Sequence, residues 1–387
     1  MTTLSKILFC ALGAASVVQT SAEDWPSLRG PDNTGISSAN LTSLQADPER
    51  IWKASGGPKG NASVVVADGL AYTFGTGKVN VLCLNAENGE KVWSKTVGEW
   101  HGNQTPTLAG GKLYLQSFMN EKDAPKGWCL DAKTGDEIWK KDLPMTVGKR
   151  HWGQAGSPLV VGDLVIFNVG GGTALKHNTG ETVWGFEGLP GMATPVLFKH
   201  KDKDAVALFL GEKLLARDLK SGKELWSIPW QTNSAVNAHQ PLIFDGKILI
   251  NSGYGLNPAM YDVSSGTPKE VWKFGKGRAG HAFAASILHG GSIYGFFENA
   301  LACLDPKDGS IRWRDRGTGS LLLIDGQLLR VSEKGEMQIA PVSAKGFEPT
   351  LTAQVHGGTV RNNPAYVDGK LFLKNDSGEV VCVRIAK

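Results

Sequence analysis

Histidine recurs in this sequence with amide and basic side chains close by. Five of the eight histidines stand between strand-like segments, at His101, His151, His239, His281 and His356. Imidazole, guanidinium and amide groups with few carboxylates beside them suit an anionic or polyhydroxylated ligand, because they donate hydrogen bonds and the guanidinium adds positive charge. Asn237 belongs to the same group of loop residues. The predicted ligand- or partner-binding residues are His101, Gln104, Arg150, His151, Trp152, Gln154, His239, Arg278, His281, Arg361 and Asn362.

The same side chains also have a purely structural explanation. Polar loop residues can satisfy backbone groups and ordered water in a channel without binding any ligand. Trp100, Trp152 and Trp230 could stack on a flat molecule, but stacking alone transfers no hydride. A binding role and a structural role therefore both stay open for these loops.

Motifs for catalysis are absent from the sequence. It contains no GxSxG, HExxH or CxxC pattern and no phosphate-binding loop. The segment GKGRAG, residues 275–280, matches GxGxxG, but it connects two strand-like segments, whereas a dinucleotide site needs a helix after the glycines. The sequence accordingly predicts no catalytic residue and no metal site.

The elements that must position these loops come from a repeat. Seven tryptophans recur at intervals of 41 to 46 residues, and each period contains three short apolar runs before its tryptophan strand. Four strands in about 40 to 45 residues are typical of one blade of a β-propeller. A glycine precedes most of these tryptophans by four positions, where it predicts a turn with positive φ. The tryptophans are Trp52, Trp93, Trp139, Trp184, Trp226, Trp272 and Trp313, and the glycines are Gly89, Gly135, Gly180, Gly222 and Gly309, with Gly266 displaced by a two-residue insertion.

The count of periods predicts an all-β, eight-bladed propeller of four-stranded antiparallel blades. The last period supplies only three strands before the chain ends at Lys387. Its missing outer strand is expected from the N-terminal side, in the segment around Trp52, so that pairing closes the ring and removes an open edge. The predicted blades begin near Asn61, Gln104, Gly156, Ala193, Gln240, Ala284, Leu321 and Asn363.

Four cysteines fall in the repeat frame. Cys83, Cys129 and Cys303 stand ten residues before their tryptophans, and Cys382 holds the matching place in the last period. Other periods use Ala174, Ala216 and Met260 there, which indicates a small apolar packing position. Equivalent positions of different blades lie beyond disulfide reach, so four unpaired buried thiols are expected.

The ends and the charge of the chain set its class. Residues 1–22 contain one lysine, an apolar run and a small-residue end at Ala22, as in a cleaved signal peptide, and Cys10 lacks the context of a lipid anchor. The expected organisation is a signal peptide at 1–22, a lead segment at 23–49 and the propeller at 50–387.

Without Lys6, 40 basic residues remain against 37 acidic ones, which favours no nucleic-acid partner. No stretch is long enough for a membrane span, and a monomer is expected.

The repeat resembles known propeller families. Units of the form ALDxxTGxxxW resemble the blades of pyrroloquinoline-quinone (PQQ) dehydrogenases and of the assembly lipoprotein BamB. The stretches DWPSLRGPDNTGIS, NSGYG and SIYGFFENALACLD look like the PQQ-like propellers of planctomycetes and verrucomicrobia. The resemblance covers nearly the whole mature chain and implies a PQQ-like, quinoprotein-dehydrogenase-like propeller.

Two functions follow from the resemblance. A PQQ dehydrogenase would imply bound Ca²⁺, a catalytic aspartate and a disulfide between adjacent cysteines, yet the inner-strand starts here offer Asn61, Gln104, Gln154, His239 and Asn362, with no acid and no adjacent cysteines. The favoured hypothesis is therefore an exported, periplasmic, non-catalytic propeller that binds a protein or glycan partner at its channel face and needs no cofactor. The alternative is a periplasmic PQQ-dependent alcohol or sugar oxidoreductase.

Overall fold

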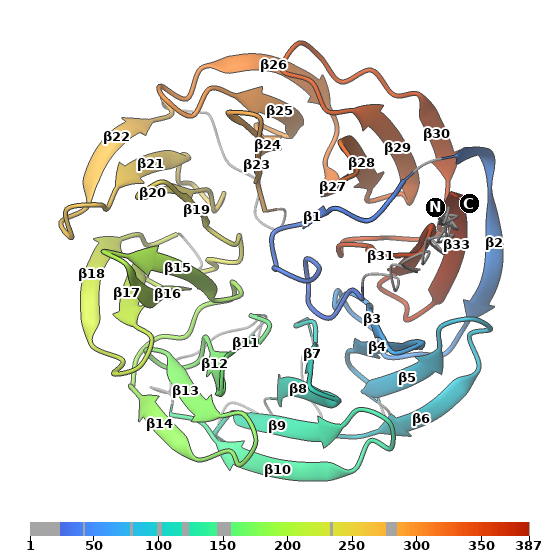
Figure 1. The fold of residues 1–387 in the computed structure, drawn as a ribbon, viewed down its shortest axis with the longest axis horizontal. Coiled ribbons are helices and arrows are strands. Elements are labelled where there is room, and N and C mark those ends of the chain that lie inside the picture. Colours follow the sequence, from blue (N-terminus) through green and yellow to red (C-terminus); the bar gives the residue numbers. More distant parts are fainter. Residues whose placement is uncertain are drawn as a thin grey trace, which may run out of the picture.

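The computed structural model is an all-β ring of eight sheets, each roughly radial, as Figure 1 shows. It describes residues 24–41, 43–77, 80–98, 103–117, 124–144, 156–232, 235–275 and 285–386, so the predicted signal peptide lies outside the described residues. The prediction of eight four-stranded antiparallel blades is confirmed. The part of the chain that the structure describes contains no helix with the length and hydrophobicity of a membrane span.

Blades 1 to 4 each consist of four consecutive strands, named from the channel outward. They are β3 (Val65–Ala67), β4 (Leu70–Phe74), β5 (Val81–Asn85) and β6 (Lys91–Lys95) in blade 1; β7 (Thr107–Ala109), β8 (Lys112–Ser117), β9 (Lys126–Asp131) and β10 (Glu137–Asp142) in blade 2; β11 (Leu159–Val161), β12 (Leu164–Phe167), β13 (Thr173–Lys176) and β14 (Thr182–Gly185) in blade 3; and β15 (Val196–His200), β16 (Lys203–Phe209), β17 (Lys213–Asp218) and β18 (Glu224–Pro229) in blade 4.

Blades 5 to 8 continue the ring, and the last two recruit strands from the N-terminal side. The strands are β19 (Leu242–Phe244), β20 (Lys247–Ile250), β21 (Ala259–Asp262) and β22 (Lys269–Lys273) in blade 5; β23 (Ile287–His289), β24 (Ser292–Phe297), β25 (Ala300–Leu304) and β26 (Ile311–Arg316) in blade 6; β27 (Gly319–Ile324), β28 (Gln327–Ser332), β29 (Glu336–Pro341) and β30 (Leu351–Gln354), with β1 (Ile36–Ser37) added, in blade 7; and β31 (Ala365–Val367), β32 (Lys370–Lys374), β33 (Val380–Ala386) and β2 (Leu44–Ala54) in blade 8.

Burial explains why the middle strands are almost continuously apolar. All four residues of β12 are buried, and so are the four central residues of β17, because neighbouring blades cover both faces of each sheet. The outer strands differ: in β10 only Trp139 is buried. A single large residue thus anchors the exposed outer strand of this blade.

Five of the seven repeat tryptophans pack against the glycine turn of the following blade. A Cβ at Gly135 would come within 2.7 Å of the Trp93 ring, and Gly135 has a φ of 76°, so both the space and the backbone favour glycine. The Trp93 indole also donates a hydrogen bond to the Ala132 carbonyl at 2.9 Å in the same turn. The repeated glycine therefore forms the turn and also provides the surface on which the tryptophan of the preceding blade packs. The same packing contact is made by Trp52 with Gly89, Trp139 with Gly180, Trp184 with Gly222 and Trp272 with Gly309.

Trp313 stacks on Phe347 of blade 7 instead of a glycine, and Trp226 lacks the contact because of the insertion in blade 5. The glycine is displaced to Gly266, which lies near Lys201 and His200 instead of a tryptophan. The buried Nε1 of Trp226 correspondingly has no hydrogen-bond partner, whereas the Nε1 of Trp139 donates to the His177 carbonyl at 2.9 Å.

This difference predicts unequal costs for the same substitution. Trp139→Phe should lower the free energy of unfolding by about 1 kcal/mol more than Trp226→Phe, because both lose the same ring area but only Trp139 loses a hydrogen bond. Urea denaturation of the two variants measures the difference. Equal losses would show that the indole bond contributes nothing at the seam.

The closure predicted around Trp52 is confirmed. Strand β2 pairs antiparallel with β33, with Trp52 opposite Cys382, and the Trp52 indole donates to the Ala86 carbonyl of blade 1 at 3.0 Å. The same tryptophan therefore completes blade 8 and fastens it to blade 1.

The cysteines of the repeat are free and fully buried, as expected. None of Cys83, Cys129, Cys303 and Cys382 forms a disulfide. Desolvation raises the pKa of Cys83 to about 12 and that of Cys129 to about 11, so both thiols stay protonated at neutral pH.

The lead segment crosses the centre of the ring, which the sequence did not indicate. Residues 24–41, called the channel segment below, run in blue through the middle of Figure 1. Trp25 exchanges backbone hydrogen bonds with Val66 at 2.7 and 2.9 Å, and β1 pairs in parallel with β27. Trp25 is completely buried. The channel is thus filled by chain that precedes the first blade.

Candidate functional site

A cavity of about 340 Å³ opens at the face where outer strands connect to the next inner strands. We call it the entrance cavity. Leu28 and Arg29 of the channel segment contribute to its lining. One part of its wall is apolar, with Met192, Val236, Ala238 and Ala285, and the other is polar, with Asn61, Ser63, Asn103, Thr194, Gln240, Tyr254, Arg361, Asn362 and Asn363.

Hydroxyl groups join the inner strands around this cavity. The backbone N–H of Asn363 donates to Ser63 Oγ at 3.0 Å, and that of Ser63 donates to Thr105 Oγ1 at 2.9 Å. The series continues from Thr105 to Ser157 Oγ at 3.0 Å and from Ser157 to Thr194 Oγ1 at 3.3 Å. One small hydroxyl residue at an equivalent place in successive blades thus fixes the cavity wall from blade 8 to blade 4.

A second layer of bonds crosses the seams where the second strand of a blade ends. Asn168 Nδ2 donates to the Phe209 carbonyl and Asn251 Nδ2 to the Phe296 carbonyl, each at 3.1 Å. The two acceptors are equivalent in position to their donors: Phe209 of blade 4 corresponds to Asn168 of blade 3. Phe296 of blade 6 likewise corresponds to Asn251 of blade 5. The matching residue of blade 8 is a lysine.

That lysine, Lys374, completes the layer at the closing seam. Its Nζ donates to the Phe74 carbonyl at 2.7 Å and to the Pro58 carbonyl at 3.2 Å. The side chain is fully buried, and desolvation lowers its pKa to about 7. No ion pair with an acid is recorded for it among the described residues.

The structure divides the predicted site residues. Gln104 and His239 occupy equivalent positions and are only 2% and 1% exposed, so they lie within the wall and do not line the cavity. His239 Nδ1 lies 3.0 Å from the Gln240 carbonyl, which can only accept, so Nδ1 carries the proton. Arg361 and Asn362 do line the cavity. Seven predicted residues lie outside the described part of the chain: His101, Arg150, His151, Trp152, Gln154, Arg278 and His281.

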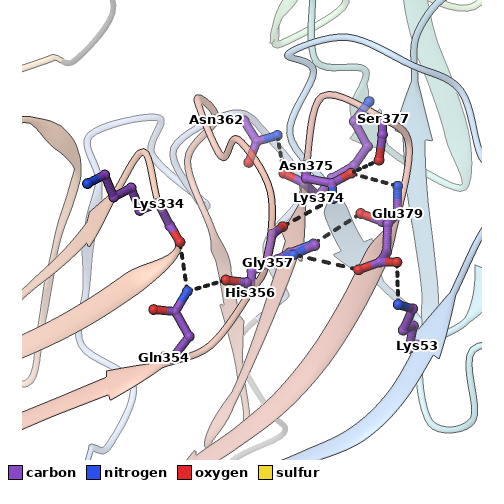
Figure 2. A network of polar contacts seen from close by, with 10 residues as sticks. All are labelled: Lys53, Lys334, Gln354, His356, Gly357, Asn362, Lys374, Asn375, Ser377 and Glu379. Atoms are coloured by element: carbon purple, nitrogen blue, oxygen red, sulfur yellow. Dashed lines mark hydrogen bonds and ion pairs between the residues drawn. The ribbon is translucent and has the colours of Figure 1, made fainter.

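A polar network holds the loop that carries Arg361 and Asn362 (Figure 2). Within it, His356 Nε2 donates to the Glu379 carbonyl at 3.2 Å, and Asn375 Nδ2 donates to the Gly357 carbonyl at 3.1 Å. Asn362 Nδ2 donates to the Lys374 carbonyl at 2.8 Å. His356 is buried, so this predicted loop histidine supports the site and does not line it.

Arg361 reaches the cavity mouth with its charge already paired. Its Nε donates to Glu333 Oε2 at 3.3 Å, and about half of its side chain is exposed. Solvent weakens such a pair, which leaves the guanidinium able to exchange partners.

Sequence reasoning missed Arg29, the buried cation of the site. Its side chain is 3% exposed, and one Nη donates to the Ser286 carbonyl at 3.3 Å. Its Nε has no hydrogen-bond partner, and no ion pair with an acid is recorded for it within the described residues. Desolvation lowers the pKa of Arg29 to about 9, so the group remains charged at neutral pH. The only signal was an arginine inside the quoted SLRGP stretch, and nothing local placed it in the channel.

The entrance cavity does not fit a resident Ca²⁺. Its described lining residues include no aspartate or glutamate. Among the described residues no three His, Cys, Asp or Glu side chains come together either. Ca²⁺ takes six to eight oxygen ligands, commonly with carboxylates among them. The donors that are present instead suit a ligand that accepts hydrogen bonds.

Known structures similar to this one include BamB and a quinohemoprotein alcohol dehydrogenase. BamB from Moraxella catarrhalis superposes with a TM-score of 0.62 at 15% identity, over 88% of this chain and 98% of that chain. A quinohemoprotein alcohol dehydrogenase, ADHIIG from Pseudomonas putida HK5, superposes with a TM-score of 0.66 at 14% identity, over 94% of this chain and 80% of that one. The computationally designed Ika8 protein superposes with a TM-score of 0.61 at 8% identity, over 87% and 99%. At such identities the likeness shows the fold alone.

The sequence itself carries the family assignment. Comparison with curated proteins gave no match. The family model described as outer membrane protein assembly factor BamB matches residues 37–187 and 118–315, which together span well over half of the chain. On the repeat, the closed eight-bladed ring and this match, the chain belongs to the BamB family of PQQ-like β-propellers.

Proposed function

We propose that this protein is an exported, periplasmic binding propeller that holds a protein or glycan partner at the entrance cavity without catalysis. The observation that carries the proposal is the donor-rich lining beside the buried Arg29, in which the described residues include no carboxylate. Buried charges in proteins are normally paired, so an unpaired guanidinium beside an open cavity favours an acceptor from outside the chain. The family match to BamB supports an interaction role.

The second candidate is a PQQ-dependent oxidoreductase, supported by the structural likeness to the quinohemoprotein alcohol dehydrogenase. The cavity lining argues against it because a Ca²⁺-bound quinone would need carboxylate ligands that the described wall does not supply.

Calorimetry of the mature protein with PQQ and Ca²⁺, followed by dye-linked oxidation of alcohols and sugars, separates the two functions. We expect no micromolar PQQ binding and no dye reduction. Tight binding with turnover would replace the binding role by the oxidoreductase.

The binding role has its own test at Arg361. Mature protein should be immobilised, offered exported proteins and a glycan array, and the Kd measured for the partner that is retained. Arg361→Ala should weaken that binding about tenfold, as expected for an arginine at an interface. Arg314→Ala is the matched control, since Arg314 is also half exposed and paired, to Glu298 at 2.8 Å, but lies on the outer strand β26. Equal losses in both variants would move binding away from the cavity.

A further inference from the structure

We propose that the entrance cavity binds a small monocarboxylate whose carboxylate is held by Arg29. This inference deepens the proposed binding function and depends on it. It names the chemistry of the group that enters the cavity: one carboxylate with an apolar body.

Arg29 is held in place by contacts that leave part of its guanidinium unused. The backbone carbonyl of Ser286 takes one Nη, and Gly35 leaves room for the guanidinium, since a Cβ there would come within 2.6 Å of an Nη. The φ of 77° at Gly35 also favours glycine. The side chain is therefore confined at the cavity lining while its Nε lacks an acceptor. An uncompensated buried charge is unfavourable, and a bound anion would remove that penalty.

A comparison with Arg217 shows that burial of an arginine in this fold does not require an unpaired group. Arg217 is 8% exposed, but its Nε donates to the Gly171 carbonyl at 3.0 Å and an Nη donates to the Gly222 carbonyl at 2.8 Å. Its guanidinium also lies over the Phe186 ring. Arg217 is satisfied by the chain itself, and Arg29 is not.

The position of acidic groups selects the entrance cavity over a second cavity that also contacts Arg29. The second cavity has a volume of about 560 Å³, and its lining includes Asp32. A carboxylate there would repel an anion. The described lining of the entrance cavity has no acid, so the anion is expected in that cavity.

Charge balance favours a monoanion. The described lining of the entrance cavity contains two cations, Arg29 and Arg361, and Glu333 already pairs with Arg361. One positive charge remains to be compensated, which matches one carboxylate. A phosphate dianion would bring a second charge into a low-dielectric site without a counter-charge. The planar fork of an arginine also matches the geometry of a carboxylate.

The side chains that line the cavity indicate the chemistry of the rest of the ligand. Met192, Val236 and Ala238 offer an apolar surface, and Asn61 and Asn103 offer amide groups opposite to it. A volume of about 340 Å³ is at the lower end of the range for small-molecule sites. The ligand is therefore a compact acid with an apolar group and one or two hydrogen-bonding groups. Either a free metabolite or the carboxyl end of a partner chain can present this chemistry.

The test uses N-acetyl-leucine and its amide as probes, with the full mature protein. The two probes differ only in the carboxylate. The acid should bind in calorimetry and raise Tm by roughly 5 °C at a hundredfold excess over its Kd. The amide and inorganic phosphate should produce no shift. Absence of acid binding at 10 mM (about the weakest affinity worth calling a site), or phosphate binding in its place, would overturn the monocarboxylate site.

Two variants assign the binding to Arg29. Arg29→Met keeps the length and removes the charge, so acid binding should weaken at least tenfold (roughly the loss of one charge-assisted hydrogen bond) while Tm without ligand stays equal or rises. Ala238→Glu places a carboxylate in the cavity wall and should abolish acid binding in a folded protein even if Arg29→Met fails to fold. Arg217→Met is the matched control, expected to lower Tm and to leave the acid affinity unchanged. Undiminished binding by Ala238→Glu and Arg29→Met would place the acid elsewhere.

One comparison identifies the source of the carboxylate, and another separates this inference from the proposed binding function. Peptides ending in a free carboxylate should bind more tightly than N-acetyl-leucine if a partner chain supplies the group, and no better if a free acid does. If the acid fails but Arg361→Ala still weakens the partner, the binding function stands and this inference alone is wrong. If the acid also binds and no macromolecule is retained, the protein is a small-molecule binder.

Discussion

Deletion of residues 50–54 should destroy the cooperative unfolding of this propeller, with a loss of at least about 4 kcal/mol in the free energy of unfolding. The deletion removes the pairing of Trp52 with Cys382 and of Lys53 with Val381. It also removes the Trp52 ring from Gly89 and its indole bond to the Ala86 carbonyl. Loss of one buried tryptophan alone typically costs about 3 to 5 kcal/mol.

The second consequence of that deletion is aggregation. It would expose the edge of β33, whose residues Val381 and Val383 are 1% and 2% exposed in the closed ring. An open, flat, apolar edge strand invites pairing with another chain. Scanning calorimetry with light scattering measures both effects. Trp52→Phe is the control, because it keeps the strand and should cost only about 1 kcal/mol for the lost indole bond.

An unchanged melting transition in the deletion variant would show that the ring is stable with seven complete blades. In that case the pairing of β2 with β33 would contribute nothing to stability. Trp52→Phe should then show no loss of stability either.

The second large effect is the pH dependence of stability that Lys374 imposes. Burial lowers the pKa of Lys374 from 10.5 to about 7. Between these values the unfolded chain binds more protons than the folded protein, so the free energy of unfolding rises with pH. The penalty for the buried charge is fully present below about pH 7 and diminishes as the pH increases. Stability should therefore increase by about 2 kcal/mol between pH 7.5 and 9 from this group.

The matched variant is Lys374→Gln, which the chain itself suggests. Gln116, Asn168 and Asn251 occupy the equivalent positions and donate amide hydrogen bonds to the next blade. The glutamine should keep a bond to the Phe74 carbonyl and should remove the titration. Denaturant unfolding at several pH values measures the free energy of unfolding of both proteins. Their difference isolates Lys374, because the buried thiols and tyrosines contribute equally to both proteins.

The outcome distinguishes a titrating lysine from a permanently charged one. If wild type and Lys374→Gln show parallel pH profiles, Lys374 does not change its charge between pH 7 and 9. Lys374→Leu adds a further check, since it leaves the carbonyls of Phe74 and Pro58 without a donor and should be about 1 to 3 kcal/mol less stable than Lys374→Gln at every pH.

The architecture could be predicted from the sequence because it is encoded by local, repeated patterns. Apolar runs of strand length, positive-φ glycines and the regularly spaced tryptophans each depend on neighbours within one blade or the next. The same reasoning explains the closure around Trp52 and the free thiols such as Cys129, whose place is taken by Ala174 in another blade. Repetition also made the irregularity of blade 5 visible, since the insertion before Trp272 displaces Gly266 and leaves Trp226 without its bond.

The site could be predicted only in part, because facing the channel is not a local property. Equivalent loop positions carry Gln104, His239 and Asn362, yet among these only Asn362 reaches the entrance cavity. The orientation of each side chain depends on which carbonyls the neighbouring blade presents. Sequence spacing identifies the loop but not those acceptors.

Long-range contacts decided the remainder, and they involve the residues with the strongest chemistry. Arg29 meets Ser286 across 257 residues, and Lys374 meets Phe74 across 300. A charged residue in an irregular lead segment looks solvent-exposed in a sequence, because no periodic pattern marks it as buried. Only the closed ring brings the channel segment beside the entrance cavity, where removal of water turns an ordinary arginine into an unpaired buried charge.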